Sequence, residues 1–290
     1  MGRDFHEQSQ CARDLYAQAD ETLGWKVSEV SFAGPDASLT ETRHCQPALY
    51  VAGMVGYSLL RERVGGEGEF GVALGLSLGE LTALAAANAF DFTTGLRVVT
   101  ERARLMQEAC EQSDGTMASC IGGTREAVEE ICGKHDVDMA NLLSPGQIVI
   151  SGARAKIEAA IAEAKASGLF KLIVPLNVAG AYHSRLMEPA RERFGNFLKT
   201  VEIRSPRVPV FSNTTGKEVT TAEEIRDALT MQVVSPVLWE DCMRGAAATG
   251  IETFYECGPS GTLAGLAKRI DRAMKVFPVA EYADLPEAVG

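Results

Sequence analysis

Residues 70–79 read Phe-Gly-Val-Ala-Leu-Gly-Leu-Ser-Leu-Gly and set the architecture of the chain. The apolar run 70–74 predicts a buried strand, and the Ala- and Leu-rich segment 78–90 predicts a buried helix. Between them, Gly75-Leu76-Ser77-Leu78-Gly79 fits G-x-S-x-G, a tight strand-to-helix elbow that exposes a strained serine. A serine in an ordinary glycine-flanked turn is the alternative, and the flanking strand and helix favour the elbow. The backbone N–H of Leu78 would then face a developing oxyanion at a helix N-terminus.

Strand and helix patterns alternate along most of the 290 residues, which predicts an α/β fold with a parallel sheet. Between about 115 and 178 the predicted order is βαββαβ, with strands at 116–121, 139–143, 148–151 and 172–176 and helices at 125–132 and 156–166. That order is typical of a ferredoxin-like unit. A helix at 94–110 and strands at 208–212 and 252–256 lie outside it. We therefore expect residues 1–114 and 179–290 to form an α/β-hydrolase-like large subdomain, and residues 115–178 an inserted ferredoxin-like small subdomain.

The composition narrows the class of protein. There are 28 basic and 39 acidic residues, a formal net charge of −11, so we expect neither a nucleic-acid nor an anionic-membrane partner. The seven cysteines are odd in number and contain no CxxC pair, which predicts reduced thiols, no disulfide framework and no metal site. Neither an apolar leader nor a membrane span is evident in the sequence. These features predict a soluble, cytoplasmic protein.

A nucleophilic serine needs a base, and the chain has four histidines. His183 is the candidate, because Gly180-Ala181-Tyr182-His183-Ser184 is a small-residue turn where the chain re-enters the large subdomain. The structural or solvated role that is usual for a lone histidine is kept for the others, which are His6, His44 and His135.

Arg102 is the most informative single residue. On a helix at about 100° per residue from Leu96, the apolar side chains of 96–110 fall in an arc of roughly 180–360°. Arg102 falls near 240°, inside that arc, and is its one charge. A guanidinium that faces a core is costly unless it is paired. It either forms a structural ion pair with a buried carboxylate or binds a carboxylate ligand in a site.

With these residues in place, the chain closely resembles the malonyl-CoA:acyl carrier protein transacylases. The match includes Gly75-Leu76-Ser77-Leu78-Gly79-Glu80 and Glu101-Arg102. It continues in the family's order over nearly the whole chain, through Asn141-Leu142-Leu143-Ser144-Pro145-Gly146-Gln147, Ala181-Tyr182-His183-Ser184, Gln232 ahead of Ser235-Pro236-Val237, and Glu256-Cys257-Gly258-Pro259.

The resemblance implies a two-step acyl transfer in fatty acid or polyketide synthesis. Ser77 would attack malonyl-CoA with His183 as general base, and the phosphopantetheine thiol of acyl carrier protein would then take the malonyl group. Arg102 would hold the malonyl carboxylate, and the backbone carbonyl of Gln232 would orient His183. The form Ala181-Tyr182-His183 is associated with malonyl rather than branched extender units. The resemblance implies no cofactor besides the substrate malonyl-CoA, and we expect a monomer.

The sequence departs from the family pattern in two places. Leu76 stands where the family usually has histidine, so the hydrogen bonding and polarity beside the nucleophile are expected to differ. The family's N-terminal strand and Pro-Gly-Gln-Gly-Ser-Gln loop, which supplies an oxyanion-hole N–H, has no match here. Gln8-Ser9-Gln10 has similar letters but lacks glycines, and we expect it on a helical surface. On this basis we expect weak or absent transacylase activity from the 290 residues.

Two alternatives stay open. An acyl-thioester hydrolase would use the same elbow, but a hydrolase of neutral esters has no use for a buried cation such as Arg102. A non-catalytic carrier-protein-binding homologue is favoured by Leu76 and by the unmatched N-terminal loop. Since CoA and acyl carrier protein are both acidic, a local positive rim is expected on this acidic chain. Its candidates are Lys268, Arg269, Arg272, Lys275 and Arg185, with solvated helix-face charges as the alternative for the first four.

Overall fold

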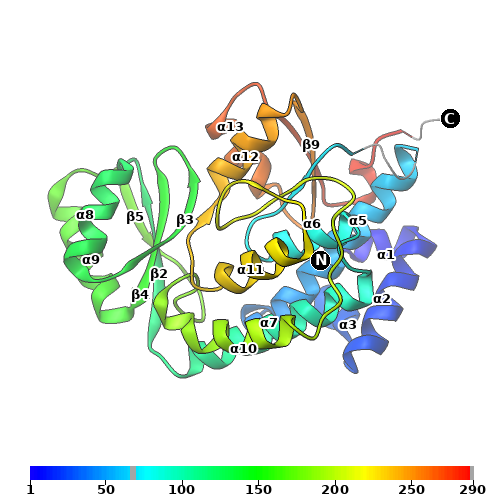
Figure 1. The fold of residues 1–290 in the computed structure, drawn as a ribbon, viewed down its shortest axis with the longest axis horizontal. Coiled ribbons are helices and arrows are strands. Elements are labelled where there is room, and N and C mark those ends of the chain that lie inside the picture. The colour runs from blue at the N-terminus through cyan, green and yellow to red at the C-terminus, as the bar shows by residue number, and fades with distance from the viewer. Residues whose placement is uncertain (66–69, 288–290) are drawn as a thin grey trace.

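The computed structural model describes residues 1–65 and 70–287. The chain opens with five helices, which lie together on one side of the molecule (Figure 1). They are α1 (Arg3–Gln8), α2 (Gln10–Leu23), α3 (Val27–Ala33), α4 (Asp36–Thr40) and α5 (Thr42–Arg63). Ser9 separates the first two and caps α2 by accepting the N–H of Ala12. The predicted helical surface at 8–10 is confirmed for the exposed Gln8 and Gln10 and is wrong for Ser9, which is buried and has an extended backbone between the two helices.

The predicted strand, turn and helix follow in order. Strand β1 (Ala73–Leu74) is shorter than the apolar run, and helix α6 (Leu78–Ala86) ends four residues before the predicted end. Helix α7 (Phe92–Glu111) begins after Asp91, whose side chain accepts the N–H of Thr94. Both helices join α2, α5, α10 (Glu188–Leu198) and α11 (Ala222–Gln232) in the largest hydrophobic core, where Tyr16 and Tyr50 are buried. This core fixes the helix that carries Arg102 against the helix that follows Ser77.

The predicted βαββαβ segment forms its own sheet. Its elements are β2 (Gly115–Ile121), α8 (Arg125–His135), β3 (Asp138–Ser144), β4 (Gln147–Ala153), α9 (Arg154–Ser167) and β5 (Leu172–Pro175). The strand order β5-β2-β4-β3 with antiparallel neighbours is that of a ferredoxin-like unit. Helices α8 and α9 pack together beside this sheet (Figure 1) and enclose a separate core with it. The exact limits of this unit, 115 and 178, stay a prediction.

The remaining elements return to the large subdomain. They are η1 (Arg185–Met187), α10 (Glu188–Leu198), β6 (Val210–Phe211), β7 (Glu218–Val219), α11 (Ala222–Gln232), β8 (Val237–Leu238), α12 (Trp239–Ala248), β9 (Thr253–Cys257), α13 (Thr262–Ile270), β10 (Lys275–Val279) and η2 (Tyr282–Asp284). In the part of the chain that the structure describes, strand β8 does not pair with the other strands of the large subdomain. It pairs parallel with β3 and is the fifth strand of the small sheet.

The predicted α/β fold with parallel strand pairing in the large subdomain is confirmed, and within the described residues this pairing is divided between two sheets. There β1 pairs with β6 in a three-stranded sheet that β7 joins antiparallel, and β9 pairs with β10 in a separate parallel sheet.

A largely apolar cavity of about 770 Å³ is lined by residues of β1, the elbow and β9. Leu76 lies at this cavity and packs with Val72 and Leu74 against the core around Trp239. The side chain beside the nucleophile is therefore in apolar surroundings.

Within residues 1–65 and 70–287, none of the helices is long and apolar enough to cross a membrane.

Candidate active site

The elbow holds Ser77 in a conformation that few non-glycine residues adopt, with φ 53° and ψ −105°. A Cβ atom on Gly75 would lie 2.0 Å from the carbonyl carbon and oxygen of Gly79, so residue 75 has to be glycine. A Cβ on Gly79 would meet no atom within 4 Å. The crowding that the sequence pattern predicts therefore restricts the first glycine of the motif and not the second.

Ser77 and His183 form a hydrogen-bonded pair. The serine Oγ lies 2.8 Å from Nε2 of His183, and Nδ1 of His183 lies 2.8 Å from the backbone oxygen of Gln232. Because a carbonyl oxygen accepts and cannot donate, Nδ1 carries the proton and Nε2 offers its lone pair to the serine. The carbonyl thus fixes the tautomer that a general base needs.

The imidazole is kept neutral by its surroundings. The side chain of His183 is buried, and its pKa falls to about 4, first because burial disfavours the charged form and then because Arg102 is close. Hydrogen bonds to the backbone oppose this shift. At neutral pH the pair is therefore in the protonation state that can accept the serine proton.

The side chain of Arg102, which comes from α7, also contacts Ser77. It is 1% exposed, and its guanidinium donates to Oε1 of Gln46 at 2.6 Å, Oε1 of Gln232 at 2.7 Å and Oγ of Ser77 at 3.1 Å. Burial lowers its pKa to about 10, with Glu80 opposing the shift, so the group stays charged at neutral pH. The helical-wheel prediction of a buried cation is confirmed. Its acceptors in the described residues are two amide oxygens and a hydroxyl rather than a carboxylate.

Glu80 is the second buried charge, one turn into α6. It is 1% exposed, and its Oε2 accepts the side-chain N–H of Gln232 at 2.7 Å and the backbone N–H of Asn213 at 3.1 Å. Burial raises its pKa to about 7, while the hydrogen bonds and Arg102 act in the opposite direction. A buried cation and a buried carboxyl that titrates near neutral pH therefore lie on either side of the amide of Gln232.

The structure brings every predicted site residue to one place: Ser77, Leu78, Arg102, His183 and Gln232. Leu78 opens α6, so its N–H has no acceptor within the helix and is available to an anion. Gln46, Glu80 and Asn213 also belong to the site but were not predicted as site residues. Glu80 carried a usable signal, since it is the one charge in the apolar segment 78–89. Gln46 and Asn213 come from distant segments of the chain, and no sequence signal marked either of them as a site residue.

The other histidines lie elsewhere. His6 is in α1, His44 stands near the start of α5, and His135 ends α8, where it contacts Glu163 at 2.9 Å. Among the residues that the structure describes, no group of three or more His, Cys, Asp or Glu side chains could hold a metal ion.

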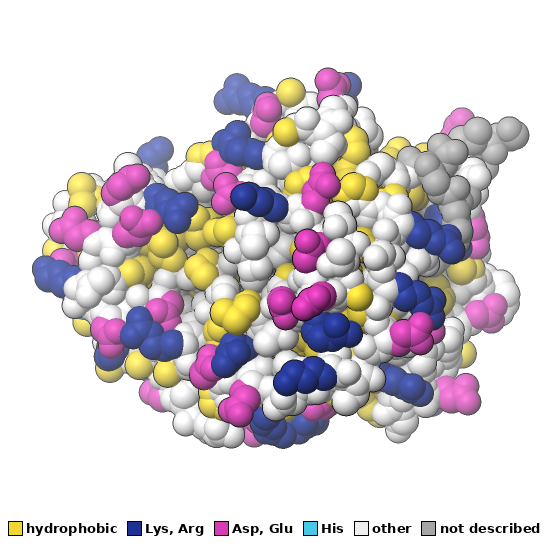
Figure 2. Space-filling view, in the orientation of Figure 1, with side chains coloured by type: hydrophobic (Ala, Val, Ile, Leu, Met, Phe, Trp, Pro, Cys, Tyr) yellow, Lys and Arg dark blue, Asp and Glu magenta, His cyan; other side chains and the backbone are white. Residues whose placement is uncertain are grey.

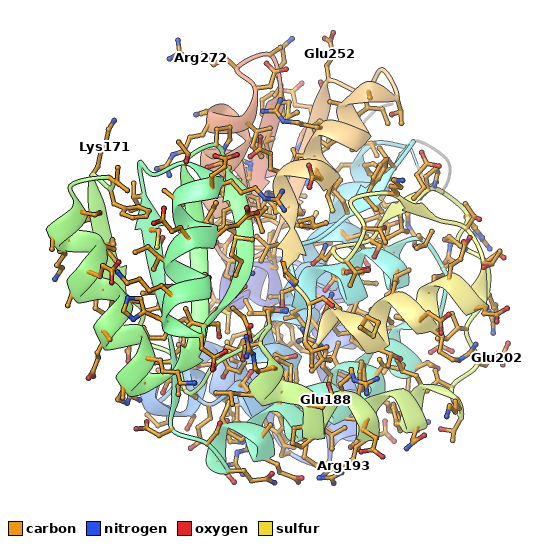
Figure 3. The ribbon with its side chains drawn as sticks, turned by 60° about the vertical axis from the view of Figure 1, so that its left-hand side comes forward. Lys171, Glu188, Arg193, Glu202, Glu252 and Arg272 are labelled. Carbon is orange, nitrogen blue, oxygen red and sulfur yellow. The ribbon has the colours of Figure 1, made fainter. Side chains whose placement is uncertain are left out.

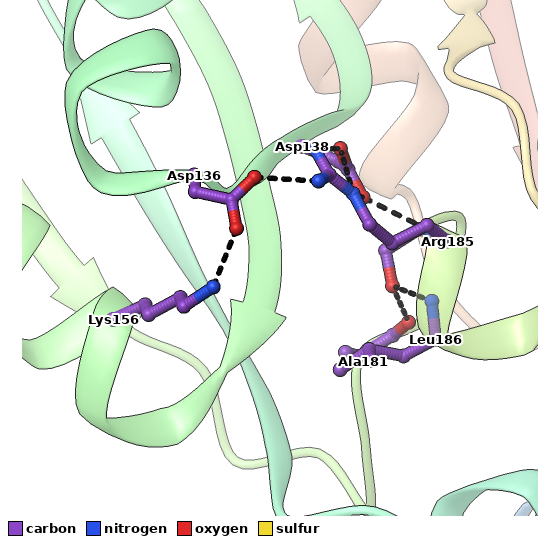
Figure 4. A network of polar contacts seen from close by, with 7 residues as sticks. Asp136, Asp138, Lys156, Ala181, Arg185 and Leu186 are labelled. Atoms are coloured by element: carbon purple, nitrogen blue, oxygen red, sulfur yellow. Dashed lines mark hydrogen bonds and ion pairs between the residues drawn. The ribbon is translucent and has the colours of Figure 1, made fainter.

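The predicted positive rim is wrong for Arg185. Its guanidinium pairs with Asp136 and Asp138, and Asp136 also pairs with Lys156, so the local charge is balanced (Figure 4). Arg269 donates to the side chain of Gln147. The exposed Arg272 projects into solvent after α13 (Figure 3). On the face drawn in Figure 2, basic and acidic side chains are interspersed rather than gathered by sign.

The chain is similar in sequence and in fold to known proteins. The model of the acyl transferase domain family matches residues 1–284. A malonyl CoA-acyl carrier protein transacylase of Bacillus subtilis is 37% identical over 294 residues, which cover 100% of this chain and 92% of that protein. The solved malonyl CoA-acyl carrier protein transacylase of Coxiella burnetii has a TM-score of 0.94 at 34% identity and covers 98% of this chain and 90% of its own. A type II PKS acyl-carrier protein in complex with its malonyl-transacylase gives a TM-score of 0.94 at 33% identity, with 98% and 93% covered.

Proposed function

The chain belongs to the acyl transferase domain family, and from that membership we propose that it moves a malonyl group from malonyl-CoA to the phosphopantetheine thiol of acyl carrier protein. The reaction serves fatty acid or polyketide synthesis. It passes through an ester on Ser77 and uses the paired Ser77 and His183 in both halves.

In the first half, Nε2 of His183 takes the proton of Ser77 while the serine oxygen attacks the thioester carbonyl. The oxyanion that forms is stabilised by the N–H of Leu78 at the start of α6. The C–S bond then breaks, and the proton on His183 passes to the departing CoA thiolate. The result is a malonyl ester on Ser77 and free CoA.

In the second half, the thiol of the carrier protein gives its proton to His183 and its sulfur attacks the ester. The C–O bond to Ser77 breaks, and the serine oxygen recovers the proton. No net proton or electron is exchanged with solvent, and the proposal includes no cofactor, metal or nucleic acid. We place the enzyme in the cytoplasm as a monomer, without a membrane partner.

One observation supports malonyl as the acyl group that the enzyme transfers. The guanidinium of Arg102 lies 3.1 Å from the oxygen that becomes acylated, in a site where it is 1% exposed. A short acyl chain that ends in a carboxylate would place its charge within reach of this cation. Hydrogen bonds from a guanidinium to a carboxylate are among the strong ones, and burial strengthens them.

Intact-mass spectrometry after mixing with malonyl-CoA tests the proposal. We expect the mass of one malonyl group to appear on Ser77, slowly if the activity is as weak as the sequence predicts, and to be transferred when carrier protein bearing phosphopantetheine is added. Ser77→Ala is expected to form no adduct. Rapid release of CoA without carrier and without a lasting adduct would indicate a hydrolase. No reaction with malonyl-CoA would instead indicate a carrier-binding homologue.

A further inference from the structure

Three buried side chains from three helices stand in line beside the nucleophile. Glu80 comes from α6, Gln232 from the end of α11 and Arg102 from α7. Each is at most 1% exposed, so bulk water does not screen the contacts between them. The side chain of Gln232 touches both charged groups, whereas its backbone oxygen binds His183.

The partners of Gln232 leave its amide one orientation. Its Nε2 donates to Oε2 of Glu80 at 2.7 Å and to the backbone oxygen of Ser77 at 2.9 Å, and its Oε1 accepts from Arg102 at 2.7 Å. Acceptors lie on one side and the guanidinium donors lie on the other. Reversing the amide would bring N–H groups against the guanidinium and an oxygen against the carboxylate. Glu80 therefore helps to determine which end of Gln232 faces Arg102.

The same arrangement gives the guanidinium no carboxylate partner among the described residues. If a carboxylate of the protein bonded directly to Arg102, it would occupy the donors that a substrate carboxylate needs. Gln46 and Gln232 hold the group through neutral oxygens, and the carboxyl of Glu80 lies beyond the amide as the acceptor of Gln232. In the described part of the chain, Nε of Arg102 is buried without a hydrogen-bond acceptor. The cation is thus fixed in place and its hydrogen-bonding capacity is partly unused.

We propose, resting on the function proposed above, that Glu80 is a positioning residue that sets the selectivity for acidic acyl groups by holding the side chain of Gln232 against Arg102. Glu80 touches no reacting atom. Its effect reaches the substrate through Gln232 and the guanidinium, so it is expected in the choice between acyl groups rather than in the chemistry that all acyl groups share.

The test is the ratio of kcat/KM for malonyl-CoA to kcat/KM for acetyl-CoA. Both substrates use Ser77 and His183, so a general loss of activity or of folded protein cancels in this ratio. Glu80→Met keeps the size of the side chain and removes its acceptors, and is expected to lower the ratio about 10- to 100-fold, the equivalent of one or two lost charge-assisted hydrogen bonds. Glu80→Gln keeps an acceptor for Gln232 and is expected to restore most of the ratio.

A matched control is a buried carboxylate outside this line. Glu256 is 8% exposed and accepts the N–H groups of Leu263 and Ala264 at the start of α13. Glu256→Met is expected to cost stability and leave the ratio unchanged. Should Glu80→Met fail to fold, Gln232→Met breaks the same line at its centre and is expected to lower the ratio by a similar factor. An unchanged ratio in the folded variant would overturn the proposal, as would an equal fall in the control.

A failure of the positioning role of Glu80 can be distinguished from a failure of the proposed malonyl transfer. If the wild-type chain forms no malonyl ester, the transfer of malonyl is refuted, and a crystal structure of Glu80→Met then tests the positioning. A guanidinium displaced from its place beside Ser77 would support the positioning role. A guanidinium and a Gln232 amide that stay in place without the carboxylate would refute it.

Discussion

The side-chain oxygen of Asn213 lies 2.6 Å from the backbone nitrogen of Ser77 and accepts its N–H. The side-chain nitrogen of the same residue donates to the backbone oxygen of Gly75 at 2.8 Å, so one amide bridges the elbow from both ends. Asn213 is fully buried, and its own N–H is bound by Glu80. A strained residue persists only where its surroundings hold it, and this bridge is one of the contacts that hold Ser77.

Asn213→Ala is expected to lower the free energy of unfolding by about 2–4 kcal/mol, because two backbone groups lose their buried partners. The rate at which an uncharged fluorophosphonate labels Ser77 should fall at least tenfold as the elbow relaxes. Urea denaturation and labelling kinetics measure the two effects. Asn196→Ala, on the exposed side of α10, is the control and should change neither. Wild-type labelling by Asn213→Ala would show that the bridge is not needed.

Arg102→Ala is expected to lower kcat/KM for malonyl-CoA by about 100-fold or more relative to acetyl-CoA, because a buried guanidinium–carboxylate contact is lost. Arg102→Lys keeps the charge and loses the planar fork, so an intermediate ratio is expected. Competition assays with the two thioesters give the ratio directly. Arg104→Ala, which removes exposed ion pairs with Glu101 and Glu108 on the same helix, is the control. An unchanged preference in Arg102→Ala would refute its assigned contact.

The acid limb of serine acylation should lie far below the ordinary histidine range. The pKa of His183 is about 4, so the imidazole loses its base function only as the pH falls toward that value. The pH profile of kcat/KM for acetyl-CoA, a substrate without a titrating acyl group, reports the free enzyme. We expect full activity at pH 5.5 and a midpoint near 4. A midpoint at 6.5 or above would contradict the buried, neutral imidazole.

Two buried groups should make opposite contributions to the pH dependence of stability. His183 has a folded pKa of about 4 against 6.5, so between these values the unfolded chain binds more protons and stability rises with pH. Glu80 has a folded pKa of about 7 against 4.5, so the folded chain binds more protons and stability falls with pH. The charged or titratable neighbours that act on Glu80 are Arg102 and Cys242.

Removing the titrating carboxyl of Glu80 should leave the contribution of His183 to the pH dependence of stability unopposed. In Glu80→Gln the free energy of unfolding should rise more steeply than in the wild type between pH 4.5 and 6.5, by up to about 1.4 kcal/mol per pH unit. Urea denaturation of both proteins across this range measures the difference in slope. Parallel curves for the two proteins would show that the carboxyl of Glu80 titrates normally in the folded state.

Periodicity and local motifs predict much of this site because the relevant residues sit in regular elements. Arg102 is identified by a helix period that places one charge among apolar neighbours, and the same reasoning applies to Glu80 in the segment 78–89. The turn at Ser77 is predicted by spacing, although the structure shows that Gly75 and not Gly79 is sterically required. These features depend on contacts within a few residues.

What could not be predicted depends on pairs that are distant along the chain. Asn213 meets Ser77 across 136 residues, and Gln46 meets Arg102 across 56. Neither residue stands out in its own segment, because a polar amide is common in loops and at helix starts. The division of the large subdomain's strands into two sheets is likewise a matter of pairing, which the pattern of apolar residues does not specify.

Strand β8 limits how far the small subdomain can be treated as a separate piece. It begins five residues after Gln232 and pairs with β3 through Val237–Asn141 and Leu238–Leu142. A fragment of residues 115–178 would lack this strand and would present the backbone of β3 as an open edge. Open edges recruit strands from other chains. The excised fragment should therefore self-associate. In the intact protein, β8 from the large subdomain covers this edge of the small sheet.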